Sequence, residues 1–251
     1  LTRTTRVVRV TEDGARYADD CRRILAELAE ADDAVRGKQG SPHGRLALTA
    51  PVLFGARFVM PIVTEYLARY PQVTASCWFM DRIVNMMDEG MDVAVRIGEL
   101  PDSSMQAVRV GQVRRVICAA PSYLEQHGVP QTPDELTAHC IVSTSAVTPT
   151  AEWRLLDNGE PRSVKLHPRL ITTSNDSAIA AAVSGFGLTR LLSYQVADQL
   201  RDGQLKTVLS AYEPAALPVH LVHREGRHAS HKARAFLDLA LERLRANPAL
   251  N

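Results

Sequence analysis

The spacing of hydrophobic residues near the start of the chain predicts one long helix with a narrow apolar stripe. From residue 15 to residue 36, the apolar positions follow alternating steps of four and three: Tyr17, Cys21, Ile24, Leu28, Ala31 and Val35. This spacing is the a/d seam of a coiled coil, which a second helix must cover. The pattern predicts dimerisation through this helix; the alternative is that the helix packs on its own domain. Gly37 and Gly40-Ser41-Pro42 end the helix, so we assign residues 15–40 to a linker helix and a hinge.

Residues 1–14 have the pattern of two short strands, or of one strand and an arm. Arg3, Arg6 and Arg9 alternate with threonine and valine residues, and Glu12-Asp13-Gly14 is a turn sequence. The segment carries a local positive charge.

Strands and helices alternate from Gly44 onward, which is typical of a doubly wound α/β domain. The elements expected first are a strand at 45–50, a helix with Val59, Ile62, Val63, Tyr66, Leu67 and Tyr70 on one face, a strand at 73–79, a short helix at 82–89 and a strand at 92–97. The strand at 92–97 is apolar and β-branched, as strands of parallel sheets are.

A second α/β unit is expected to begin near Val113. Its predicted elements are a strand at 113–119, a helix at 122–126, a hairpin of 153–156 and 163–167 around Asn158-Gly159, a strand at 170–173, a helix at 176–184 and strands at 188–192 and 219–223. A last helix carries Ala233, Phe236, Leu237, Ala240 and Leu244 on its core face. We expect one subdomain from 44–112 with 224–251, a second from 113–223, and a cleft between them.

Composition narrows the class of protein. The chain has 251 residues, of which 45% are hydrophobic and 23% charged, so it can bury a core. Lys plus Arg (29) nearly balance Asp plus Glu (28), so any contact with nucleic acid must come from a local patch. The longest purely apolar run, 178–183, is too short for a bilayer, and the first ten residues lack the core of a signal peptide. We expect a cytoplasmic protein with no membrane partner.

Motifs for catalysis or metal binding are weak. The four cysteines, Cys21, Cys77, Cys118 and Cys140, are too far apart for a Cys-x-x-Cys pair, and we expect buried small hydrophobes rather than a redox switch. Gly185-Phe186-Gly187 follows a helix, so it is a helix stop rather than a dinucleotide loop. His220 and His223 are three apart on a strand and point to opposite faces. We predict no enzyme activity, no cofactor and no metal.

Several short motifs occur in a characteristic order: Arg3-Thr4-Thr5-Arg6, Val10-Thr11-Glu12-Asp13-Gly14, Gly44-Arg45-Leu46-Ala47-Leu48-Thr49-Ala50-Pro51, Tyr66-Leu67-Ala68-Arg69-Tyr70-Pro71, Glu89-Gly90-Met91-Asp92-Val93-Ala94-Val95-Arg96-Ile97-Gly98, Leu100-Pro101-Asp102-Ser103-Ser104 and Ala120-Pro121-Ser122-Tyr123-Leu124. Because these motifs occur in this order and with this spacing, the chain resembles the LysR-type transcriptional regulators over nearly its whole length. Asn85-Met86-Met87 departs from the family's usual sequence at this point, which has an acidic residue followed by an aliphatic one.

The resemblance implies a winged helix-turn-helix, a dimerising linker helix, and an effector-binding domain of two Rossmann-like subdomains of periplasmic-binding-protein type. Residues 1–14 would then be a remnant of the wing, with Arg3, Thr5 and Arg6 touching DNA, and the helix-turn-helix itself is expected before Leu1. The implied function is a DNA-binding regulator that is controlled by a small molecule and acts as a dimer or tetramer. The alternative function is a free-standing solute-binding protein.

The effector site is expected beyond the carboxyl ends of the strands, where ligands of open α/β sheets bind. The candidates, in segments that correspond to the family's ligand contacts, are Ala50, Pro51, Val52, Leu53, Arg96, Ile97, Gly98, Ser103, Thr173, Ser174, Asn175 and Asp176. Backbone N–H groups at helix starts and the Arg96 guanidinium favour a small anion such as a carboxylate. The alternatives are that Ser174 or Asn175 only caps its helix and that Arg96 is paired within the protein.

Overall fold

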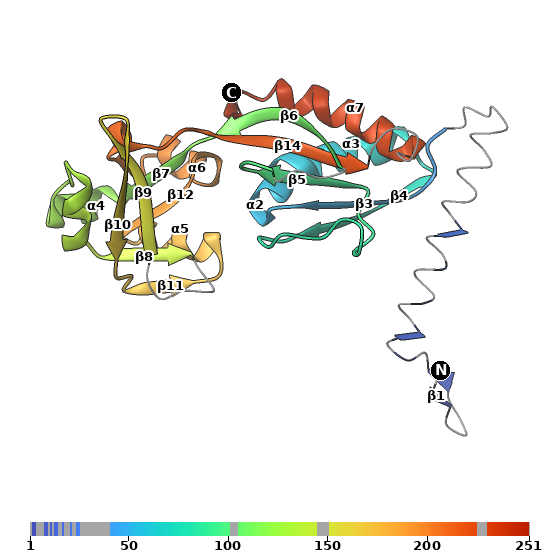
Figure 1. Ribbon diagram of the computed structural model, residues 1–251, viewed down its shortest axis with the longest axis horizontal. Helices are drawn as coiled ribbons and strands as arrows, with labels where there is room; N and C mark the ends of the chain where they lie inside the picture. The colour runs from blue at the N-terminus through green and yellow to red at the C-terminus, as the bar shows by residue number, and fades with distance from the viewer. Residues whose placement is uncertain are drawn as a thin grey trace. The chain divides into compact units, whose positions relative to one another are not determined.

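The computed structural model describes residues 2–3, 8–9, 11, 13–14, 17, 21, 24–25, 41–100, 105–144, 151–224 and 230–250 (Figure 1). Contacts divide the chain into two units: Leu1–Val95 with Asp102–Val108 and Leu221–Arg243, and Arg96–Pro101 with Arg109–His220 and Leu244–Asn251. Strands β6 (Met105–Val113) and β14 (Leu217–Arg224) each run from one unit into the other. Relative to the expected ranges, residues 96–101, 109–112 and 244–251 fall with the second unit rather than the first, whereas 221–223 fall with the first unit rather than the second.

The first unit is built on parallel strands. β3 (Gly44–Ala50) pairs in parallel with β4 (Val73–Phe79) along its whole length and with β5 (Val93–Ile97) at Leu48↔Val93. The sheet order is β4-β3-β5-β14-β6. The three strands expected from the sequence at 45–50, 73–79 and 92–97 are confirmed. β3 and β5 each carry a continuous run of buried residues, 46–50 and 93–95, as strands of parallel sheets do.

One helical segment with three parts follows β3: α2 (Val52–Phe54), the π-helical turn η1 (Gly55–Val59) and α3 (Met60–Arg69). It begins seven residues before the first expected contact position, Val59. A Cβ atom on Gly55 would lie 2.4 Å from the Phe79 ring, so only glycine fits where the helix crosses the end of β4.

The C-terminal helix α7 (His231–Arg245) packs beside α3 (Figure 1). Its predicted core face is confirmed, because Ala233, Phe236, Leu237, Ala240 and Leu244 are all buried. The Phe236 ring meets the Tyr66 ring edge-on at 5.4 Å, and the Tyr66 hydroxyl donates a hydrogen bond to the Lys232 carbonyl at 2.7 Å. These contacts join α7 to α3.

The prediction of a short helix at 82–89 is wrong, because this segment forms turns. The side-chain oxygen of Asn85 accepts hydrogen bonds from the backbone N–H groups of Met87 (3.1 Å) and Asp88 (3.4 Å). Arg82 spans the segment with two hydrogen bonds to the Glu89 carboxylate, at 2.9 and 2.7 Å. An asparagine side chain that accepts hydrogen bonds from the backbone N–H groups two and three residues later competes with the hydrogen bonds of a helix.

The second unit contains a sheet of order β11-β8-β12-β7-β13. Its strands are β7 (Arg115–Ala119), β8 (Ile141–Thr144), β11 (Leu170–Thr172), β12 (Leu188–Leu192) and β13 (Lys206–Val208). β8, β11 and β12 run parallel, and β7 is antiparallel to β12 and β13. The strands β6, β8 and β13 were not expected from the sequence. β8 and β13 have only four and three residues, too few to show a period.

Two layers cover the sheet of the second unit. The predicted hairpin is confirmed as β9 (Ala151–Asp157) and β10 (Glu160–Leu166), with the positive φ of Asn158 (53°) and Gly159 (85°) that a primed two-residue turn requires. Buried side chains of the hairpin, of β7 and β12, and of α4 (Pro121–His127) form one core cluster. Helix α5 (Asn175–Val183) packs on β8 and β12. The remaining short helices are η2 (Pro133–Ala138), η3 (Ser193–Gln195), α6 (Ala197–Arg201), η4 (Ser210–Tyr212) and η6 (Pro248–Leu250).

The N-terminal segment contains two short strands, one of the two expected arrangements. β1 (Thr2–Arg3) pairs with β2 (Val8–Arg9) in antiparallel register. Of the seam positions, Tyr17, Cys21 and Ile24 are helical, whereas Leu28, Ala31 and Val35 lie outside the described residues. Tyr17 and Ile24 are 72% and 58% exposed, so neither is buried by its own chain.

The four cysteines are free thiols. Burial raises the pKa of the Cys118 thiol to about 12, and it also raises the pKa of Cys77. These two thiols are therefore poor nucleophiles. Only Cys118 is buried as expected, whereas Cys21, Cys77 and Cys140 are partly exposed. Across the described part of the chain, no helix has the length and apolar character needed to span a membrane. Within the same residues, no cluster of three His, Cys, Asp or Glu side chains could hold a metal ion.

We expect Glu65→Gln to make the free energy of unfolding less dependent on pH in the acidic range. Arg243 donates two hydrogen bonds to the Glu65 carboxylate, at 2.9 and 2.7 Å, and Arg69 pairs with it as well. Chiefly through Arg243, the pKa of Glu65 falls from 4.5 to about 2. The contribution of the ionised Glu65 carboxylate to the free energy of unfolding is complete above its unfolded pKa of 4.5. This contribution is lost as the pH falls toward 2.

Urea unfolding at a series of pH values measures this effect. The parent should lose more stability than Glu65→Gln between those two pH values. The exposed Glu125 on α4 offers the control, since Glu125→Gln should follow the parent curve. Parallel curves for the parent and Glu65→Gln would contradict the assignment.

Candidate functional site

Two of the expected site segments lie on one edge of the first sheet. Because β3, β4 and β5 are parallel, their carboxyl ends lie on the same edge. Ala50 ends β3 and leads into Pro51, Val52 and Leu53, whereas Arg96 and Ile97 end β5. Strand pairing thus brings 50–53 and 96–97 to the same edge, although Leu53 and Arg96 are 43 positions apart in the sequence. Ser103 lies outside the described residues.

The start of the helix after β3 already holds a carboxylate. The backbone N–H of Val52 donates a hydrogen bond to Asp81 Oδ1 at 3.0 Å, and Pro51 has no N–H to offer. The expectation that 50–53 present free N–H groups to an anion is therefore wrong for Pro51 and Val52. Asp81 was missed in the sequence, although it follows β4 directly and Met80 bonds to the Ala50 carbonyl at 2.9 Å.

A buried hydroxyl lies beside this edge. Thr49, the residue before Ala50, is only 2% exposed. Its Oγ1 has no hydrogen-bond partner among the described residues. A buried hydroxyl without a partner costs free energy, so a water molecule or a ligand that bonded to it would stabilise the protein. Neither its burial nor its lack of a partner could be foreseen from sequence, since threonine is also common in exposed strands.

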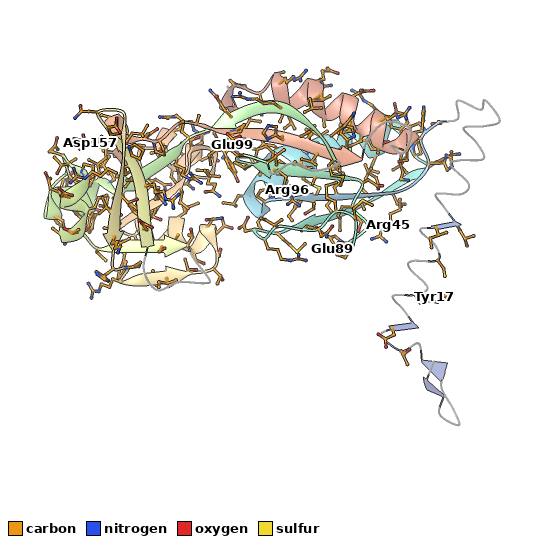
Figure 2. The ribbon with its side chains drawn as sticks, viewed as in Figure 1. Tyr17, Arg45, Glu89, Arg96, Glu99 and Asp157 are labelled. Carbon is orange, nitrogen blue, oxygen red and sulfur yellow. The ribbon has the colours of Figure 1, made fainter. Side chains whose placement is uncertain are left out.

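Arg96 lies near the end of β5 (Figure 2). The side chain is half-buried, and Arg96 interacts with other groups of the chain. Gly98, two residues on, has φ +110° and donates its N–H to the Pro218 carbonyl at 2.8 Å. Glycine is required there because other residues rarely adopt that φ.

In the second unit, the expected segment 173–176 joins β11 to α5. The Ser174 hydroxyl accepts a hydrogen bond from the Ser177 N–H at 3.4 Å, which makes it the N-cap of the helix. The capping role proposed as an alternative for Ser174 is therefore observed. Asp176 lies in the first turn, where the helix dipole favours a negative charge, and both it and Thr173 are exposed. Asn175 is half-buried at the first position of the helix.

The chain matches one protein family over most of its length. Residues 39–245 fit the model of the LysR substrate binding domain. The chain belongs to the LysR-type transcriptional regulators. Among curated relatives of this LysR-type regulator, an HTH-type transcriptional regulator of Xanthomonas campestris pv. campestris is 31% identical over 97% of this chain and 72% of the relative. An HTH-type transcriptional repressor of Pseudomonas aeruginosa is 30% identical over 99% of this chain and 79% of its own length.

Solved structures show the same architecture. CrgA, a LysR-type transcriptional regulator from Neisseria meningitidis, matches with a TM-score of 0.73 and 28% identity over 98% of this chain and 83% of its own. The full-length virulence activator AphB of Vibrio cholerae matches with a TM-score of 0.73 and 25% identity, over 96% and 82% of the two chains. The predicted α/β fold of two effector-binding subdomains is confirmed. This protein is therefore a transcriptional regulator, and the alternative of a free-standing solute-binding protein is set aside.

Proposed function

We propose that this LysR-type regulator is a cytoplasmic DNA-binding protein, without catalytic activity, whose effector domain binds a small carboxylate. The observation that carries the effector class is the placement of Arg96 near the end of β5, on the sheet edge where β3 ends. The names of the relatives support the regulator, since all those compared above are transcriptional regulators. In this proposal residues 1–14 belong to the wing, 15–40 to the linker helix and the remainder to the effector domain.

The proposed effector contacts come from the segments selected in the sequence. They comprise Ala50, Pro51, Val52, Leu53, Arg96, Ile97, Gly98, Ser103, Thr173, Ser174, Asn175 and Asp176. Because Asp81 already accepts the Val52 N–H, the ligand carboxylate is assigned to the Arg96 guanidinium rather than to the helix start. The exposed Val52 and the partly exposed Leu53 and Ile97 would cover the carbon skeleton.

We expect an organic acid, but not its matched amide, to raise the thermal stability of the protein. A ligand at a hundred times its dissociation constant adds roughly 2.7 kcal/mol to the free energy of unfolding. A thermal-shift screen of carboxylic acids paired with their neutral amides measures this directly. Arg96→Ala should abolish the shift by the acid while leaving the unliganded protein folded.

Asp81→Asn supplies the opposite test. It removes a negative charge from the same edge while the amide oxygen can still accept the Val52 N–H, so an acid should bind more tightly. Weaker binding of the acid to Asp81→Asn would contradict the proposal. So would a library in which only neutral compounds stabilise the protein, or an Arg96→Ala variant that responds like the parent.

The proposed DNA contacts are Arg3, Thr5 and Arg6; Thr5 and Arg6 lie outside the described residues. Arginines of a wing bond to phosphates, and each phosphate contact contributes about 0.9 to the slope of log affinity against log salt. We expect Arg3→Gln with Arg6→Gln to reduce that slope by about 2 for residues 1–251 binding duplex DNA. Arg201→Gln, on α6, removes a charge far along the sequence and serves as the control. A slope that the double variant does not change would contradict the assignment.

A further inference from the structure

An arginine lies half-buried under the hairpin of the second unit. Arg190, in β12, has its guanidinium carbon 5.2 Å from the centre of the Trp153 ring. Its Nη1 donates a hydrogen bond to the Arg154 carbonyl at 3.3 Å. Trp153 is only 4% exposed and belongs to the core cluster between hairpin and sheet. A guanidinium has five N–H donors, so most of its hydrogen-bonding capacity is not used by these contacts.

A second arginine lies on the same face of the sheet. β12 and β7 pair with Leu192 opposite Arg115 and Arg190 opposite Ile117. Residues that pair across strands, and residues two apart along a strand, share one face. Arg190 and Arg115 are therefore diagonal neighbours, which in antiparallel sheets places their Cβ atoms about 7–8 Å apart. Arg115 is exposed, whereas Arg190 is partly withdrawn from solvent.

The two positive charges are not neutralised locally. Among the described residues, neither Arg190 nor Arg115 forms an ion pair, whereas the adjacent Arg114 bonds to Glu213 at 2.9 Å. Burial, and secondly the charge of Arg115, lower the pKa of Arg190 to about 10. The two like charges repel each other, so a bound anion would relieve this unfavourable interaction.

This position differs from the candidate segment 173–176. Helix α5 packs on β8 and β12, and its buried Ala178, Ile179 and Ala182 are absent from the cluster that joins hairpin and sheet. The side chains of Leu188 and Arg190 point to the hairpin face, since Leu188 is part of that cluster. Arg115, at the start of the antiparallel β7, lies by the carboxyl end of β12, the kind of edge at which ligands of α/β sheets bind.

We propose that Arg190 and Arg115 form a second ligand site on the hairpin face, which binds the phosphate group of a small metabolite. A phosphate monoester carries a charge of about −1.5 to −2 at neutral pH and balances two guanidinium groups, which a monocarboxylate does not. Its three free oxygens can accept hydrogen bonds from both arginines, which approach from neighbouring strands. Because Arg190 also contacts Trp153 and the Arg154 carbonyl, the bound phosphate would tie the hairpin to β7.

Inorganic phosphate is the probe, titrated against residues 1–251 at constant ionic strength set with sodium chloride. The unfolding temperature should rise along a saturable curve, and calorimetry should give the same dissociation constant. Arg115→Gln should weaken phosphate binding by at least about tenfold, the effect of one charge-assisted hydrogen bond. Because Arg115 is exposed, this variant tests the site even if Arg190→Gln fails to fold.

Matched variants separate this site from other effects of charge. Arg154→Gln removes an exposed arginine from the same hairpin and should leave the phosphate response intact. Arg96→Ala should also leave it intact, so the failure of this proposal and the failure of the effector proposal are distinguishable. Acetate at the same ionic strength should give a smaller shift than phosphate.

Three results would overturn the proposal. The first is the absence of a saturable phosphate response, or an equal response in the parent and Arg115→Gln. The second is an acetate response as strong as that to phosphate, which would assign the pair to carboxylates. The third is a change of sedimentation coefficient in Arg115→Gln without any effect of phosphate, which would show that the arginines meet an acidic surface of another chain.

Discussion

Replacing Ile24 and Leu28 with aspartate is expected to dissociate the dimer that the seam predicts into monomers. The alternating apolar seam places both residues at a and d positions of a coiled coil, and Ile24 is 58% exposed on its own chain. The double variant puts two carboxylates from each chain into the dimer seam, where desolvation without an opposite charge costs several kcal/mol. Sedimentation velocity should show a smaller species at concentrations where the parent is dimeric.

Ala26→Asp with Ala29→Asp is the matched control for the seam. These two alanines fall at f and b positions of the same heptads, on the outer side of a two-stranded coil, so they add the same charge without entering the seam. The control should sediment like the parent. If Ile24→Asp with Leu28→Asp also sediments like the parent, the helix does not dimerise through this seam.

Replacing Phe236 with alanine is expected to lower the free energy of unfolding by about 3–5 kcal/mol, the usual cost of removing a phenyl ring from a core. Phe236 is 1% exposed, and its ring meets that of Tyr66, which is fully buried. The substitution leaves a cavity between α3 and α7, and close-packed surroundings fill such a space only in part. Urea unfolding followed by circular dichroism measures the loss.

Phe186→Ala controls for the loss of a phenyl ring. Phe186 is 37% exposed and packs against the Arg169 guanidinium, so its removal leaves no buried cavity and should cost far less. Equal losses for the two variants would mean that Phe236 is not an anchor between α3 and α7.

Several features of the candidate site depended on contacts far apart in sequence. Asp81 holds the Val52 N–H across 29 residues, and no local pattern marks an aspartate after a strand as the partner of a helix start. The expected set nevertheless contained Ala50 and Arg96, because each ends a strand that is recognisable from its own side chains. The position of these two residues at strand ends therefore followed from the sequence, whereas the charge of their surroundings did not.

Elements stabilised by contacts between near neighbours in the chain could be predicted before the structure was known. The tight turn at Asn158-Gly159, the core face of α7 and the parallel strands β3, β4 and β5 all have periods or turn residues that are visible within a short window. The a/d seam predicted at 17–35 rests on the same kind of local period.

Elements stabilised by residues far away in the sequence could not be predicted in this way. β8 and β13 are too short to show a pattern and are stable because β7, β11 and β12 supply their hydrogen bonds. The segment 82–89 has helical spacing, yet the Asn85 side chain and the Arg82–Glu89 pair stabilise turns instead. The sequence alone shows that Arg190 is a basic residue. Its position beside the Trp153 ring and diagonal to Arg115 arises only when the hairpin and the sheet pack together.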